Sequence, residues 1–409
     1  MVALRCVVLL AIAGTSPAQA VLLVPGVFPT IAAAIGAAQP GDVVLVATGT
    51  YPPFVCDKAI TIEAVPQATV LVKNASLSLA TTSFAVPAGG TAKVVGLEFR
   101  NDNSVQRHAT RVVSGTVAFE NCRFEGEVYG DAGLRVDAAA VWLRACRLTG
   151  QTTTAPFWQG GNVNQCAGLH VNQGFVAAVD TEFRGGRVLA DAYLGAGHGI
   201  LAVSSSLHCV RCTMVGGASF ALGGATPNGD GLRVQSGVGT WLADCTLVGG
   251  SQPLHPQGGG AVDNLGGLPV HLTRCTATGG AGSVAVGLAV HGPVVPDDAL
   301  GLAAATVDPL LGSVYRIDYL TAPNAVVATF LADRFEVLAP VATIESTWAP
   351  AASVFACVAV LTSDSAGIAV SLTPIPNVPA LQHASFWLHG VAWSGSGLHV
   401  APPIGGVLR

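Results

Sequence analysis

The chain has 409 residues, of which 51% are hydrophobic, 11% are charged and 50 are glycine. Soluble domains ordinarily carry about 25% charged residues and about 7% glycine, so charge is scarce here and glycine is abundant. The hydrophobic content excludes intrinsic disorder, and the lack of a Gly-X-Y period excludes collagen. A net charge of -5 with only three lysines, Lys58, Lys73 and Lys93, gives no basic surface for nucleic acid.

The first 20 residues are typical of a secretory signal peptide. Arg5 precedes an apolar run at 6–13, and residues 18–20 (Ala-Gln-Ala) form a small-x-small cleavage site. A membrane-spanning helix needs about 20 apolar residues, which this run does not reach. We therefore predict that residues 1–20 are removed and that the mature protein is secreted or lies at the cell surface, with no membrane span.

A short helix followed by strands is expected at the start of the mature chain. Thr30 is suited to cap a helix whose apolar face consists of Ile31, Ala34, Ile35 and Ala38. Residues 40–42 (Pro-Gly-Asp) then turn the chain into the first strands. Such a helix would cover the open end of an apolar core.

The middle of the chain repeats two linked phrases six times. Copies of the first, ten-residue phrase occupy 117–126, 141–150, 176–185, 207–216, 240–249 and 270–279. Copies of the second, four-residue phrase occupy 133–136, 168–171, 200–203, 231–234, 261–264 and 287–290. Apolar residues alternate in each phrase, and glycine closes the first where the chain must turn. Short strands recurring at about 24 to 35 residues predict a parallel β-solenoid, and the frame of leucine-rich repeats is missing.

A specific resemblance to a known protein family lies in residues 28–51 and 59–62. This stretch resembles the opening of the right-handed parallel β-helix proteins of the pectin lyase-like superfamily, and the resemblance extends over about residues 24–292. It implies an all-β fold: a right-handed parallel β-helix over 21–292 with a short N-terminal capping helix. A small β-sandwich is expected to follow it.

Nine cysteines remain once Cys6 is removed, and an odd number leaves at least one without a partner in the chain. The sixth position of the first phrase is held by Cys122, Cys146, Thr181, Cys212, Cys245 and Cys275. We interpret these as an inward structural column, with Cys209 also in the core. Neighbouring coils are close enough for a disulfide such as Cys122 to Cys146, but the sequence leaves the pairing open. No second ligand pair accompanies Cys209-x-x-Cys212, so we predict no metal site and no cofactor.

The second phrase predicts an outward polar face, because side chains alternate along a strand. With Leu134, Leu169, Leu201 and Leu232 facing inward, the predicted outward column is Arg135, His170, Ala202, Arg233 and Asp263. A second column contains Asp137, Asn172, Ser204 and Gln235, and the strand entrances carry Asp131, Gln165, His198 and Asp230. The longest loops carry Phe157, Trp158, Tyr193 and Phe220.

Aromatic faces beside hydrogen-bonding side chains suit the rings and hydroxyls of a sugar polymer. We therefore predict polysaccharide binding at Asp131, Arg135, His170, Arg233, Asp263, Trp158 and Tyr193. The competing interpretation is that polar residues simply cover a solvated sheet while the aromatic residues pack beneath their own loops.

Two short motifs raise an enzymatic alternative. Gly197-His198-Gly199 resembles the Gly-His-Gly motif of the polygalacturonase family, and residues 228–231 (Asn-Gly-Asp-Gly) resemble its Asn-x-Asp strand entrance. Their order is reversed, and Asp230 alone does not supply the two opposed carboxyl groups that inverting hydrolysis needs. No acidic cluster suited to calcium is visible. We predict a binding or structural protein. The alternative is a polysaccharide lyase or glycoside hydrolase that uses His198 and Asp230.

A proline-containing segment at 293–298 marks the expected boundary to a C-terminal module. Alternating runs at 313–319, 326–331 and 366–372 predict a β-sandwich over 297–409. The segment 375–400 resembles short C-terminal modules of secreted bacterial proteins, which generally attach or display. We interpret His383, His389 and His399 as surface residues of strands rather than metal ligands.

Overall fold

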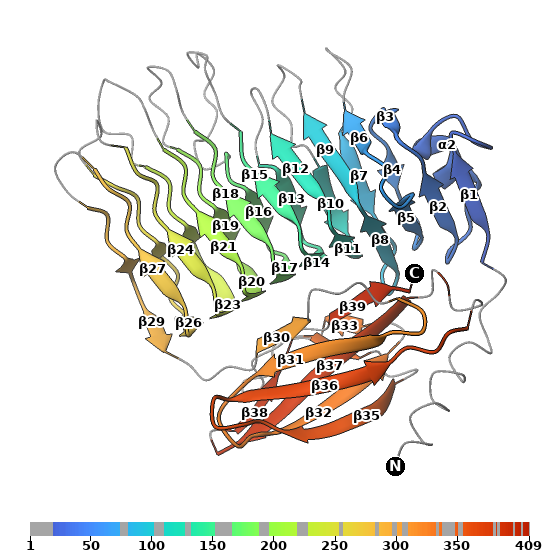
Figure 1. Ribbon diagram of the computed structural model, residues 1–409. Helices are drawn as coiled ribbons and strands as arrows, with labels where there is room; N and C mark the ends of the chain where they lie inside the picture. The colour runs from blue at the N-terminus through green and yellow to red at the C-terminus, as the bar shows by residue number, and fades with distance from the viewer. Residues whose placement is uncertain are drawn as a thin grey trace, which may run out of the picture. The chain divides into compact units, whose positions relative to one another are not determined.

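The computed structural model describes residues 19–73, 81–101, 110–126, 132–151, 166–187, 196–218, 228–252, 257–282, 286–296, 301–304, 310–332, 335–337, 348–350, 355–378, 382, 385–395, 397–401 and 404–408 (Figure 1). They belong to two compact units, Ala20–Pro296 and Asp297–Arg409, and each is described by itself. The first unit is a right-handed parallel β-helix, as predicted. It contains three parallel sheets of 11, nine and nine strands, which we call A, B and C.

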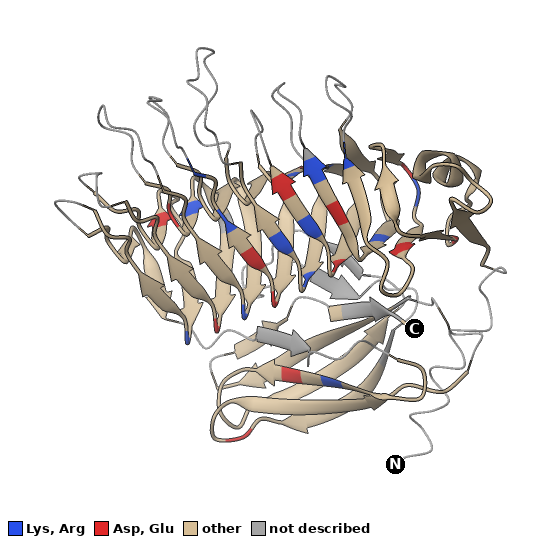
Figure 2. Ribbon diagram, turned by 45° about the horizontal axis from the view of Figure 1, so that its top comes forward, with Lys and Arg blue, Asp and Glu red and all other residues tan. Residues whose placement is uncertain are grey.

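Each coil adds one strand to sheet C, then one to sheet A and then one to sheet B. Sheet A consists of β1 (Val21–Val24), β2 (Val43–Val46), β5 (Thr61–Ala64), β8 (Thr91–Val95), β11 (Thr116–Glu120), β14 (Ala140–Arg144), β17 (Phe175–Val179), β20 (Ser205–Val210), β23 (Gly237–Ala243), β26 (Val270–Thr273) and β29 (Val294–Pro296). Sheet B consists of β3 (Gly49–Tyr51), β6 (Val70–Lys73), β9 (Leu97–Asn101), β12 (Arg123–Gly126), β15 (Arg147–Thr149), β18 (Glu182–Arg184), β21 (Thr213–Val215), β24 (Thr246–Val248) and β27 (Thr276–Thr278). Sheet C consists of β4 (Val55–Cys56), β7 (Thr82–Ala85), β10 (Thr110–Ser114), β13 (Leu134–Asp137), β16 (Leu169–Asn172), β19 (Ile200–Val203), β22 (Leu232–Val234), β25 (Val262–Asn264) and β28 (Val290–His291). Figure 2 shows the few charged residues as separate bands on these strands.

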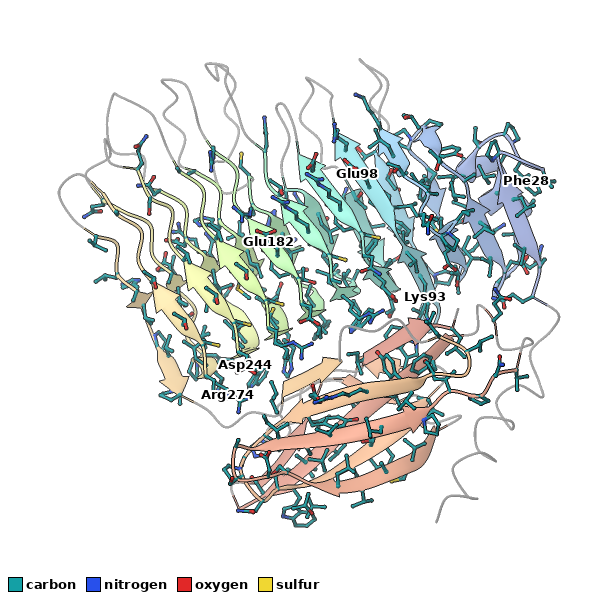
Figure 3. All side chains as sticks on the ribbon, viewed as in Figure 1. Phe28, Lys93, Glu98, Glu182, Asp244 and Arg274 are labelled. Atoms are coloured by element: carbon teal, nitrogen blue, oxygen red, sulfur yellow. The ribbon has the colours of Figure 1, made fainter. Side chains whose placement is uncertain are left out.

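The ten-residue phrase spans two strands rather than the single strand that the sequence predicted. Between sheets A and B the chain turns a corner at one residue with φ between 49° and 52°. These corner residues are Asn121, Ala145, Asp180, Arg211, Asp244 and Arg274. A single residue other than glycine tolerates this left-handed conformation at a modest cost. Ion pairs join successive corners: Arg211 lies 2.6 Å from Asp180, and Arg274 lies 2.8 Å from Asp244 (Figure 3).

The cysteine column faces the core, as predicted. Cys122, Cys146, Cys212 and Cys245 are at most 3% exposed, and Thr181 occupies the same column at 2%. Their thiols contact backbone oxygens of their own and neighbouring coils; Cys146 Sγ, for example, lies 3.4 Å from Phe119 O. All nine cysteines of the described residues are free thiols, so the column is held by packing rather than by disulfides.

Glycines form a seam where the chain leaves sheet B and returns to sheet C. Their backbone groups are linked from coil to coil: Gly217 N–H donates to Gly197 O at 2.8 Å, and Gly229 N–H donates to Gly217 O at 3.0 Å. A Cβ atom on Gly217 would lie 1.8 Å from Gly186 O. We call Gly186, Gly197, Gly217, Gly229, Gly250, Gly259, Gly280 and Gly287 the glycine seam. Its close backbone packing explains part of the glycine excess, because no side chain fits there.

The predicted capping helix is α2 (Ile31–Ala37). Thr30 caps it by accepting a hydrogen bond from Ala33 N–H, and its buried face contains Ile31, Ala34 and Ile35. Lys58 caps the other end, since its Nζ donates to the carbonyl oxygens of Ile35, Gly36 and Ala38 at 2.8 to 2.9 Å. A cation at a helix C-terminus satisfies free carbonyl groups and opposes the helix dipole.

The C-terminal unit is an antiparallel β-sandwich. Its strands are β30 (Gly301–Ala304), β31 (Val314–Leu320), β32 (Val326–Ala332), β33 (Phe335–Val337), β34 (Trp348–Pro350), β35 (Phe355–Thr362), β36 (Ile368–Pro374), β37 (Ser385–Ser394), β38 (Gly397–Val400) and β39 (Ile404–Val407). Tyr315 of one sheet meets Phe386 of another at 5.3 Å between ring centroids.

The interpretation of the C-terminal histidines as surface residues is wrong for two of them. His389 is 3% exposed and His399 is 5% exposed. For His389 the reason is that both faces of β37 are covered at this point: Leu388 and His389 are neighbours that point to opposite faces, and both are buried. His383 lies outside the described residues.

Candidate functional site

The outer face of sheet C carries a column of polar residues in register. Pairing along the sheet places Arg111, Arg135, His170, Leu201, Arg233, Asp263 and His291 on successive coils. The structure therefore brings four predicted residues, Arg135, His170, Arg233 and Asp263, into one line. Neighbouring strands of a sheet lie about 4.8 Å apart, so the line presents one side chain per coil at that spacing.

One member of the predicted column is wrong. Leu201, not Ala202, occupies the outward position beside His170, because Ile200 pairs with Leu169. Ala202 belongs to the core, whereas Leu201 packs with Ala132 and Ala167 and is 1% exposed. This apolar position separates two groups of polar residues, which contain members of the column and residues beside it.

The first group is centred on Asp137, which lies between two arginines. Its carboxylate accepts hydrogen bonds from Arg111 Nε at 2.7 Å and from Arg135 Nε at 3.0 Å. Burial by itself would raise the pKa of Asp137, but the hydrogen bonds and charges of the two arginines outweigh it and lower that pKa below its usual value. The side chains of Arg111 and Arg135 remain 46% and 22% exposed.

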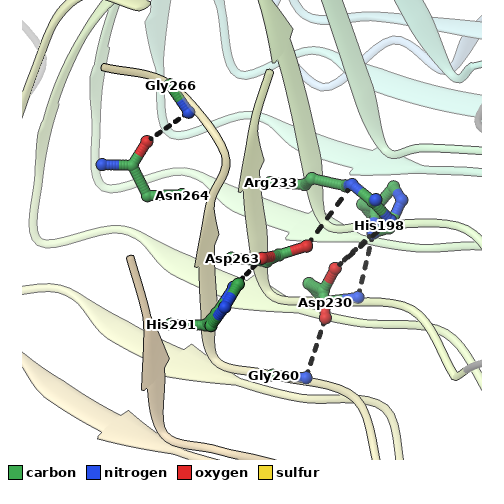
Figure 4. Close-up of polar contacts among 8 residues, drawn as sticks. All are labelled: His198, Asp230, Arg233, Gly260, Asp263, Asn264, Gly266 and His291. Atoms are coloured by element: carbon green, nitrogen blue, oxygen red, sulfur yellow. Dashed lines mark hydrogen bonds and ion pairs between the residues drawn. The ribbon is translucent and has the colours of Figure 1, made fainter. Parts of the chain in front are cut away.

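The second group joins four coils through contacts among two histidines, two aspartates and an arginine (Figure 4). His198 Nδ1 lies 3.2 Å from Asp230 Oδ2, and Arg233 Nη1 lies 3.9 Å from the same oxygen. Arg233 Nε lies 3.5 Å from Asp263 Oδ2, and His291 Nδ1 lies 2.7 Å from Asp263 Oδ1. The two predicted catalytic residues, His198 and Asp230, are therefore neighbours although 32 positions separate them in the sequence.

The two predicted catalytic residues also have structural contacts. The backbone N–H of Asp230 donates to His198 Nδ1 at 3.0 Å, and Asp230 Oδ1 accepts from Gly260 N–H at 2.8 Å. The His198 side chain is 5% exposed and that of Asp230 is 11% exposed. Both therefore fasten neighbouring coils together at the strand entrance. Within the described part of the chain, no group of three His, Cys, Asp or Glu side chains is arranged to hold a metal ion.

Several predicted contributors cannot be placed. Asp131, Trp158 and Tyr193, and the loop residues Phe157, Gln165 and Phe220, lie outside the described residues. Sequence reasoning also missed Arg111 and His291. Thr110-Arg111-Val112 repeats the pattern of Leu134-Arg135-Val136, and this similarity was the available signal for Arg111. His291 pairs with Asp263 on the neighbouring strand, and the residues around His291 do not predict this pairing.

Comparison with known proteins assigns no family. No family model and no curated protein matches the chain. Among solved structures, full-length tailspike protein 2 from Escherichia coli O157:H7 bacteriophage CAB120 aligns with 10% sequence identity and a TM-score of 0.30. The alignment covers 92% of this chain, which spans 65% of the tailspike chain. A likeness of this strength assigns no activity, ligand or partner. No helix among the described residues is long and apolar enough to cross a membrane.

Proposed function

We propose that the protein is exported and binds polysaccharide along the outer face of sheet C, as a binding or structural protein at the cell surface. The observation that carries this proposal is the in-register column from Arg111 to His291, with one outward side chain per coil. A linear sugar polymer lying along the solenoid axis would meet a donor or an acceptor on each coil of this column except that of Leu201. The signal-like residues 1–20 and the resemblance of residues 28–62 to the pectin lyase-like superfamily support the proposal.

The charges of this face indicate recognition of hydroxyl groups rather than of a single strong charge. Arg111, Arg135 and Arg233 balance Asp137, Asp230 and Asp263, so three cations face three carboxylates. Guanidinium groups donate hydrogen bonds and carboxylates accept them, and sugar hydroxyls do both. A face with equal numbers of such donors and acceptors therefore suits a neutral glycan.

A panel of soluble polysaccharides tests the proposal by isothermal titration calorimetry with the mature protein. The double variant Arg135→Gln, Arg233→Gln should weaken binding of the recognised glycan about tenfold, which corresponds to the loss of about 1.4 kcal/mol. Arg274→Gln is the matched control, because it removes an ion-paired arginine at the corner between sheets A and B. Failure of every glycan to bind, or equal binding by the double variant, would overturn the proposal.

A second candidate function is a polysaccharide lyase or glycoside hydrolase that uses His198 and Asp230. The proximity of His198 and Asp230, with 3.2 Å between Nδ1 and Oδ2, favours it, since imidazole and carboxyl groups are the usual side chains of general acid–base catalysis. The same panel is assayed for unsaturated products and for reducing ends. Turnover that disappears in His198→Ala and in Asp230→Ala would establish the enzyme and replace the binding-only proposal.

A further inference from the structure

Sheet B carries a second set of charged residues, on a different face from the proposed polysaccharide site. We call Arg100, Arg123, Arg147 and Arg184 the arginine row; they lie on β9, β12, β15 and β18, which belong to four successive coils. Between or beside these outward positions, Phe99, Phe124, Leu148 and Phe183 face the core and are 0% exposed. Figure 2 shows the resulting bands of charge, and Figure 3 labels Glu98 and Glu182 on the same sheet.

The arginines lie nearer to solvent than their acidic partners. Their side chains are 32%, 47%, 47% and 44% exposed in chain order, whereas those of Glu98, Glu125 and Glu182 are 21%, 18% and 28% exposed. Arg100 lies 2.7 Å from Glu98 and 3.2 Å from Glu125, and Arg147 lies 3.3 Å from Glu182. Arg123 pairs with Glu125, and Arg184 pairs with Glu182. Each arginine side chain on this part of the sheet is therefore more exposed to solvent than the glutamate side chains that pair with it.

Positive charge exceeds negative charge on this face, although the whole chain carries -5. The four arginines and Lys73, which pairs with Arg100 along the sheet, make five cations against three glutamates, a local excess of two. Arg123 and Arg147 occupy one column of the sheet, whereas Arg100 and Arg184 occupy the column two residues further along each strand. A polymer lying along the solenoid axis would therefore meet one arginine on each of the four coils, in one or the other column, at about 4.8 Å per coil. Exposed ion pairs of this kind contribute little to the stability of the fold, so stability alone does not account for the excess of cations on this face.

We infer that the outer face of sheet B binds a linear acidic polysaccharide, whose carboxylate or sulfate groups pair with the arginine row. Guanidinium groups recognise such oxyanions through two parallel N–H···O bonds, which an ammonium group does not offer. The ion pair of Arg147 with Glu182 uses Nε, and the Arg147 side chain is 47% exposed. This inference goes beyond the proposed function, because it concerns another face and a charged ligand.

Three polymers test the inference by isothermal titration calorimetry with the mature, full-length protein. Alginate offers carboxylates, dextran sulfate offers sulfates, and dextran is the neutral control. We expect at least one acidic polymer to bind and dextran not to bind on this face, with an affinity that falls about tenfold or more between 50 and 200 mM salt as screening increases. Dextran binding that is weakened by Arg123→Gln with Arg147→Gln as much as acidic-polymer binding is, or acidic-polymer binding that is insensitive to salt, would overturn the inference.

Variants locate the binding on sheet B. Arg123→Gln combined with Arg147→Gln should weaken acidic-polymer binding about tenfold, and Glu125→Gln should strengthen it because it removes a repelling charge. Arg274→Gln is the matched control, and circular dichroism checks that each variant is folded. If the double variant does not fold, Arg184→Gln replaces it. Unchanged affinity in a folded arginine variant, or weaker binding by Glu125→Gln, would refute the assignment.

The outcome is distinguishable from that of the proposed function. Arg135→Gln with Arg233→Gln should leave acidic-polymer binding unchanged, because both residues lie on sheet C. Acidic-polymer binding that depends on those two residues and not on the arginine row would place it on sheet C and overturn the sheet B assignment.

Discussion

Replacement of Gly217 by alanine should disrupt the glycine seam and destabilise the β-helix. The added Cβ would lie 1.8 Å from Gly186 O and 2.8 Å from Gly186 C, and both are backbone atoms that cannot move aside as a flexible side chain would. The backbone must therefore shift, which breaks the hydrogen bonds from Gly217 N–H to Gly197 O and from Gly229 N–H to Gly217 O. Each bond contributes about 1 kcal/mol and an unsatisfied buried group costs about 1–3 kcal/mol, so we expect a loss of about 3–5 kcal/mol.

Urea and thermal unfolding of the protein, followed by circular dichroism, measure this loss. Gly36→Ala is the matched control: Gly36 lies inside α2, and a Cβ added there meets nothing within 4 Å. Because alanine favours a helix over glycine, the control should gain about 0.5–1 kcal/mol. A Gly217→Ala protein that unfolds at the same urea concentration as the wild type would refute the reasoning on backbone packing.

Three further predictions concern charge and thiol chemistry. Asp137→Asn should cost about 1–3 kcal/mol at pH 7, as expected for lost hydrogen bonds to charged groups. The pKa of Asp137 is lowered in the folded state, so its contribution to stability is present above the unfolded pKa of about 3.9 and is lost as pH falls through the folded value. A difference in unfolding free energy between wild type and variant that stays constant from pH 7 to pH 2 would contradict this. Lys58→Met should lower the melting temperature by removing about 2 kcal/mol, because three carbonyl groups at the end of α2 lose their donor; an unchanged melting curve would show that this cap is unimportant. Brief maleimide treatment should label exposed Cys357 and leave Cys146, Cys212 and Cys245 unlabelled, since burial raises the pKa of these three thiols well above its usual value. Mass spectrometry that finds label on Cys146 in the native protein would contradict the buried column.

The register of sheet C illustrates why the candidate site was only partly predictable. In Leu134-Arg135-Val136 the sequence predicts which side chains face inward and which faces outward, because a charged residue lies between two apolar ones. Ile200-Leu201-Ala202-Val203 has no polar residue to mark the outward side, and sequence reasoning placed it one position out of register. A shift of one residue exchanges the two faces of a strand. The pairing with neighbouring coils settles which side chain faces solvent.

The charged face of sheet B was missed for a related reason. Its strands are three to five residues long, and from β12 to β27 each follows a corner residue that is not glycine, so the ten-residue phrase looked like one strand. Charge-apolar-charge triplets such as Glu98-Phe99-Arg100 were the available signal. Once the corner is recognised, alternation directs Phe99 to the core and both charges outward.

The sequence by itself determined the β-solenoid, the capping helix and the buried cysteine column, because alternation, capping and periodicity are local properties that a linear pattern records. Only the tertiary structure decided which residues meet across coils. His198 and Asp230 are joined by stacking of β19 on β22, and the glycine seam arises where successive coils approach backbone to backbone. Loop lengths differ from coil to coil, so sequence separation does not reveal these contacts. Hydrogen bonding between the coils determines them.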